Sequence, residues 1–123
     1  MSYARRLVVP VTTAADGSAT AYSEVLTGKL SQIRYVKGDF DNGSTFTITS
    51  EATGETLWTE AAVNASATRA PRQATHSTAG AAALYAGAGA AVNDKIALAD
   101  DRIKIVIAAG GNVKSGVFHV ILE

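Results

Sequence analysis

Arg102-Ile103-Lys104-Ile105-Val106-Ile107-Ala108-Ala109 is the stretch of this sequence that decides its fold. Its isoleucines recur at every second position, and Arg102, Lys104 and Val106 occupy the alternate positions. Because the side chains of a β-strand point alternately to opposite faces, this period predicts a strand with one buried and one exposed face. Gly110-Gly111-Asn112 follows it and predicts a hairpin turn into a last strand over 114–122.

The same alternation recurs upstream, where strands are expected over 3–12, 20–26, 29–37, 44–50, 55–60 and 95–99. Turn residues lie between these runs, at Asp16-Gly17, Gly28, Asn42-Gly43, Thr53-Gly54 and Asp100-Asp101. No segment has a convincing amphipathic helical pattern. About eight short strands separated by turns predict an all-β protein. We expect an antiparallel β-sandwich or jelly-roll-like barrel, formed by residues 1–123 as a single domain.

Residues 61–93 interrupt this pattern with a long run of Ala, Gly, Ser and Thr and few large apolar side chains. A structureless loop of this length is uncommon in a compact domain and is usually functional or disordered. The segment is therefore expected to be an extended loop or arm that becomes ordered against a neighbour, or a flexible surface loop. A loose helix over 78–91, around Leu84 and Tyr85, is the other possibility, but three glycines penalise it.

Composition limits the partners and the chemistry. The chain has 123 residues, with 11 Lys and Arg against 11 Asp and Glu, so its formal net charge is zero. Nucleic-acid-binding proteins and proteins of anionic membrane surfaces usually carry a positive excess, so neither partner is expected. The absence of Cys excludes disulfides, thiolate metal sites and cysteine nucleophiles. No apolar run approaches the roughly 20 residues of a membrane span.

Three motifs resemble parts of calcium, nucleotide or histidine-based sites, but none fits the pattern that such a site requires. Residues 39–43 (Asp-Phe-Asp-Asn-Gly) begin like a calcium loop, but the later ligand positions fall on residues that do not fit. Gly87-Ala88-Gly89 follows no strand of a βαβ unit. His76 and His119 have no carboxylate or second His at metal-ligand spacing, and no nucleophile elbow is present. We therefore expect no catalytic activity, no metal and no cofactor.

The candidate partner-binding residues are Arg69, Pro71, Arg72 and Tyr85. Pro71 favours an extended backbone at the preceding residue, which presents two arginines on a stiff peptide. Arginine pairs in bidentate fashion with carboxylates, so these cations could dock a partner, or they could simply keep a loop solvated. Trp58, the one tryptophan, is expected in the core, with a contact surface as the alternative.

Three runs carry a resemblance to a known class of protein: residues 63–73 (Val-Asn-Ala-Ser-Ala-Thr-Arg-Ala-Pro-Arg-Gln), 32–37 (Gln-Ile-Arg-Tyr-Val-Lys), and 96–99 with 102–106. Together they resemble small virion structural proteins of tailed bacteriophages, of the capsid decoration or cement type. The resemblance covers most of the chain, from about Thr20 to its end, and its motifs are not chemical signatures.

The resemblance implies a β-rich structural protein that binds the outer surface of a phage capsid and stabilises the shell. Its expected partners are the major capsid protein and further copies of itself, with a trimer as the first hypothesis. It would be found on the virion, after assembly in the host cytoplasm. A head-completion or tail structural protein is the nearest alternative, and a carbohydrate-binding or host-surface-binding β-sandwich is an alternative of another class.

Overall fold

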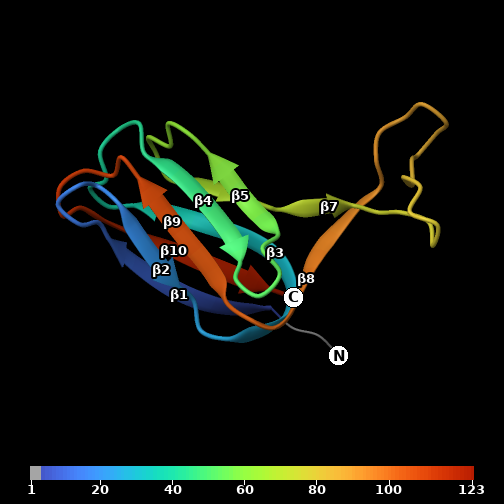
Figure 1. The fold of residues 1–123 in the computed structure, drawn as a ribbon, viewed down its shortest axis with the longest axis horizontal. Coiled ribbons are helices and arrows are strands. Elements are labelled where there is room, and N and C mark those ends of the chain that lie inside the picture. The colour runs from blue at the N-terminus through green and yellow to red at the C-terminus, as the bar shows by residue number, and fades with distance from the viewer. Residues whose placement is uncertain (1–3) are drawn as a thin grey trace.

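A computed structural model describes residues 4–123, and it contains ten strands and no helix in that range. Tyr3, expected at the start of the first strand, lies outside the described residues. Two antiparallel sheets face each other as a β-sandwich, from which one segment projects (Figure 1). The all-β sandwich expected from the sequence is confirmed.

The first sheet, sheet A, has the strand order β1-β10-β3-β8-β7, and β6 also pairs with β3. The second, sheet B, has the order β2-β9-β4-β5. In sheet A the strands are β1 (Arg5–Thr12), β3 (Leu26–Lys37), β6 (Ala67–Arg69), β7 (Arg72–Ala74), β8 (Asn93–Asp101) and β10 (Ser115–Leu122). In sheet B they are β2 (Ala19–Tyr22), β4 (Thr45–Ser50), β5 (Thr56–Glu60) and β9 (Ile103–Ala108).

The core lies between the sheets and follows the predicted alternation. Ile103, Ile105 and Ile107 on β9 are all 0% exposed, whereas the residues between them are partly exposed. Aromatic side chains from both sheets meet there, with the ring centroids of Tyr35 and Phe46 4.7 Å apart and edge to face. Trp58 is 5% exposed and packs against this group, so its predicted core position is confirmed.

Two predicted turns are wrong. Gly28 does not separate two strands but lies inside β3, at a register shift with φ of 149°. This backbone conformation suits a glycine, which lets the strand bulge and continue. Asp100-Asp101 is the end of β8 rather than a turn, and Arg102 alone separates β8 from β9. The loose helix over 78–91, which was the alternative to a loop or arm, does not form.

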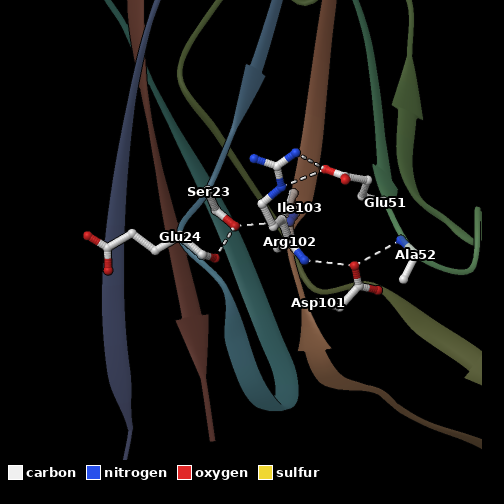
Figure 2. A network of polar contacts seen from close by, with 7 residues as sticks. All are labelled: Ser23, Glu24, Glu51, Ala52, Asp101, Arg102 and Ile103. Atoms are coloured by element: carbon white, nitrogen blue, oxygen red, sulfur yellow. Dashed lines mark hydrogen bonds and ion pairs between the residues drawn. The ribbon is translucent and has the colours of Figure 1, made fainter.

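Arg102, between β8 and β9, takes the chain from sheet A to sheet B, and a network of polar contacts surrounds this crossing (Figure 2). Asp101 is 5% exposed, and its Oδ1 accepts hydrogen bonds from the backbone N–H groups of Ala52, at 2.9 Å, and Arg102, at 2.7 Å. The Ser23 hydroxyl accepts a bond from the Ile103 N–H at 2.9 Å. These side chains satisfy backbone groups that the abrupt change of sheet leaves without ladder partners.

Residues 61–93, expected to form one loop or arm, divide into two parts. The first belongs to the sandwich, because Val63 is 3% exposed and β6 pairs with β3 at Ile33, Arg34 and Tyr35. The second, beginning with β7, leaves the sandwich together with the first residues of β8 (Figure 1). The short strands β6 and β7 bring the total to ten where about eight were expected.

Candidate interaction arm

The most distinctive feature outside the sandwich is residues 72–95, here called the arm. Its base is a two-stranded ribbon in which Arg72, Gln73 and Ala74 of β7 pair with Lys95, Asp94 and Asn93 of β8. Within residues 4–123, none of the buried core residues falls between Val63 and Ile96. The arm therefore contributes nothing to the sandwich core, and it extends well beyond the sheets (Figure 1).

Backbone hydrogen bonds give the arm an order of its own. The Thr75 N–H donates to the Val92 carbonyl at 2.9 Å, the Val92 N–H to the Ala83 carbonyl at 3.0 Å, and the Ala83 N–H to the Thr75 carbonyl at 2.9 Å. Beyond this junction the chain forms two small hairpins, one with a bridge between His76 and Ala82 and one with a bridge between Leu84 and Ala91. The tip of the arm is thus forked (Figure 1).

Beyond the charged residues of its base, the arm is uncharged and built mostly from small side chains. Residues 73–93 contain no Lys, Arg, Asp or Glu, and they include nine alanines and three glycines. Two larger apolar groups are exposed at the second hairpin, Leu84 at 40% and Tyr85 at 76%. Small side chains let another backbone approach closely, and Leu84 and Tyr85 offer apolar area for a partner to cover.

Arg69, one of the predicted partner-binding residues, is engaged within the sandwich. Its guanidinium forms a bidentate ion pair with Glu60, with Nε–Oε1 and Nη2–Oε2 distances of 2.8 and 2.9 Å. It also lies 5.7 Å from the centre of the Trp58 ring. Hydrogen bonds from Arg69 and Trp58 lower the pKa of Glu60, and the bond to Glu60 raises the pKa of Arg69. Arg69 therefore fastens β6 to the sandwich.

Of the other three candidates, Arg72 and Tyr85 lie in the arm and Pro71 lies directly before it. Pro71 precedes its base, and Arg72 lies in the base, where its Nη1 donates to the carbonyls of Ser31 and Pro71 at 3.0 and 2.8 Å. Tyr85 lies at the tip, where its N–H donates to the Ala90 carbonyl at 3.0 Å. The structure thus places the four predicted residues at three locations rather than in one site.

Sequence reasoning did not identify the arm as an ordered, forked structure. Its order depends on backbone bonds between residues such as Thr75 and Val92, and these leave no periodic pattern of side chains. The available signals were the glycines at 80, 87 and 89, which mark the turns of the two hairpins. Exposed Tyr85, in an otherwise small-residue segment, was the side chain that could be singled out.

No group of three potential metal ligands occurs within residues 4–123. The Asp39 carboxylate, considered above for calcium, instead accepts a hydrogen bond from the Ser115 N–H at 2.7 Å, which lowers the pKa of Asp39. In the part of the chain that the structure describes, no helix is long and apolar enough to cross a membrane.

Compared with known proteins, the chain matches no protein-family model, no curated protein and no solved structure.

Proposed function

We propose that this chain is a structural protein of a tailed-phage virion that decorates the outer surface of the capsid and stabilises the shell. The observation that carries the proposal is the arm: an ordered extension, uncharged over residues 73–93, that contributes nothing to the core and exposes Leu84 and Tyr85. The resemblance of residues 32–37, 63–73, and 96–99 with 102–106 to capsid decoration proteins suggests that the assembly is a phage capsid. The major capsid protein and further copies of this chain are the proposed partners.

A rigid sandwich and an ordered arm both favour attachment to a shell. A sandwich with an aromatic core shared by both sheets resists deformation, which suits a protein that reinforces a shell. An arm that is already hydrogen-bonded before docking loses little conformational entropy on binding, so weak contacts suffice. Repetition over a symmetric lattice then multiplies those contacts through effective concentration.

The test is incorporation of arm variants into particles of the phage or prophage that encodes this chain. Replacing residues 75–92 with Asn-Gly joins Ala74 to Asn93, which are paired across the ribbon, through the type of turn preferred in two-residue hairpins. We expect this shortened chain to fold, with a thermal midpoint within about 5 °C of the parent, because no core residue is lost. We also expect it to be missing from the particles.

A finer pair of variants separates the apolar groups of the arm from apolar exposure in general. Changing Leu84 and Tyr85 together to Ala should lower occupancy of the particle. Changing Val25 and Val113 together to Ala, which removes apolar groups that are 59% and 62% exposed away from the arm, should leave occupancy unchanged. Normal incorporation of the shortened chain would refute attachment through the arm. Incorporation at only a few copies per particle would favour the head-completion or tail alternative.

A further inference from the structure

A second surface lies on the outer face of sheet A, the face of β1, β10 and β3 that points away from sheet B. The buried residues of these strands, such as Val9, Phe118 and Tyr35, point inward, so their neighbours in sequence point outward. The strand register aligns the outward residues in rows across the sheet, and Val8, His119 and Arg34 form the central row.

Apolar groups make up much of this face. In the row next to the central one, Pro10, Val117 and Val36 lie side by side across the three strands. Val8 is 52% exposed and Val36 is 41% exposed, although both belong to well-paired strands. Apolar side chains that adjoin on a flat sheet surface, rather than occurring singly, are typical of an interaction site.

The strands of sheet A carry an excess of positive charge, although the whole chain is neutral. Of the 11 Lys and Arg residues, eight lie in the strands of sheet A: two in β1, three in β3 and one each in β6, β7 and β8. Only three of the 11 Asp and Glu residues lie in these strands, all in β8. The strands β1, β3 and β10 contain no carboxylate at all.

The outward cations on this face have no carboxylate partner. Arg34 donates to the Thr68 hydroxyl at 3.1 Å, and the ion pairs found within residues 4–123 involve only Arg69 and Arg102. Glu24 borders Arg6 and Val8 beyond the edge of β1 without forming an ion pair with Arg6. In the central row, the Nδ1 atom of His119 is buried and has no hydrogen-bond partner among the described residues. Arg6 and Arg34 therefore give the face a positive charge that no carboxylate of β1, β3 or β10 neutralises.

We infer that the outer face of sheet A is a docking surface for a protein whose own surface combines apolar side chains with carboxylates. Complementary charge sets the orientation of such an interface, and apolar contact supplies area to bury. A bare polyphosphate would leave Val8, Val36 and Val117 uncovered. Single-stranded nucleic acid calls for aromatic platforms, and the aromatic rings of these strands, Tyr35 and Phe118, are both 0% exposed and point inward. The inference goes beyond the proposed function, since it concerns a surface other than the arm.

The experiment uses the full chain labelled with ¹⁵N and a defined probe, an end-capped peptide of alternating Glu and Val. We expect chemical-shift changes confined to β1, β3 and β10 and binding that weakens as salt is added. Changing Arg6 and Arg34 together to Glu should weaken binding at least about tenfold. The matched control is Lys104→Glu on β9 of sheet B, which should leave the affinity unchanged.

Three further probes identify the partner class. A peptide of alternating Lys and Val should bind at least about tenfold more weakly if charge complementarity is the cause. Binding of duplex DNA or of phosphatidylglycerol vesicles at this face, as tightly as the Glu-Val peptide, would overturn the assignment to a protein partner. Absence of Glu-Val binding would overturn the docking surface itself. The arm-shortened chain should still bind the peptide, so failure of this inference and failure of the proposed function are separate results.

Discussion

Changing Asp101 to Ala should destabilise the fold far more than a change at any exposed carboxylate. Asp101 is 5% exposed and holds the point where the chain passes from sheet A to sheet B, by accepting hydrogen bonds from the N–H groups of Ala52 and Arg102 (Figure 2). Each hydrogen bond to a charged group contributes about 1.5–3 kcal/mol. Both bonds are accepted by the same oxygen, Oδ1, so its removal should lower the free energy of unfolding by about 3–6 kcal/mol.

Urea unfolding followed by tryptophan fluorescence measures this loss, because Trp58 lies in the core. For a slope of about 1–3 kcal/mol/M, a loss of about 3 kcal/mol lowers the urea midpoint by about 1–3 M. Asp101→Asn keeps a neutral oxygen acceptor and should lose about half as much.

Asp94→Ala is the control for this measurement. It removes an exposed carboxylate from the arm base and should change stability by no more than about 0.5 kcal/mol. An Asp101→Ala variant as stable as the Asp94→Ala control would refute the reasoning that the carboxylate secures the crossing between sheets.

Two further predictions concern named side chains. Tyr35 is 0% exposed, and its hydroxyl has no hydrogen-bond partner among the described residues. Tyr35→Phe should therefore be neutral, or stabilise the fold by up to about 1 kcal/mol, in the same urea assay. A clear loss of stability would contradict the packing described. Hydrogen bonds from Arg69 and Trp58 lower the pKa of Glu60 below its ordinary value of 4.5, so an NMR titration should find the midpoint below that value in the native chain and nearer to it in Arg69→Gln. Because the folded-state pKa is depressed, the stability contributed by this pair is present above about pH 4.5 and is lost as the pH falls through the folded-state value. Identical Glu60 midpoints in the two chains would contradict this role of Arg69.

Local patterns predicted the sandwich because each long strand buries alternate residues. The isoleucines of 103–107 and the pair Phe46 and Ile48 occupy the core as their period-two spacing requires. Gly28 was misassigned because a glycine marks a bulge inside a strand as readily as a turn between strands, and only the pairing of β3 with β8 distinguishes the two.

The arm and the role of Arg69 depend on contacts that sequence spacing does not encode. The strands β6 and β7 are three residues long, too short for a periodic pattern, and their partners lie far away in sequence, as in the pairing of Arg69 with Ile33. Arg69 and Arg72 lie three residues apart and have alike side chains, yet one pairs with Glu60 and the other with backbone carbonyls. The outer face of sheet A likewise required the strand order, since its rows combine residues from both ends of the chain.

The central claim is that this chain decorates a capsid shell, and the most direct measurement is its copy number in purified virions of the phage or prophage that encodes it, by quantitative mass spectrometry. We expect a copy number comparable with that of the major capsid protein. A copy number of a few would place the chain at the neck or tail, and its absence from the particle would contradict the virion assignment altogether.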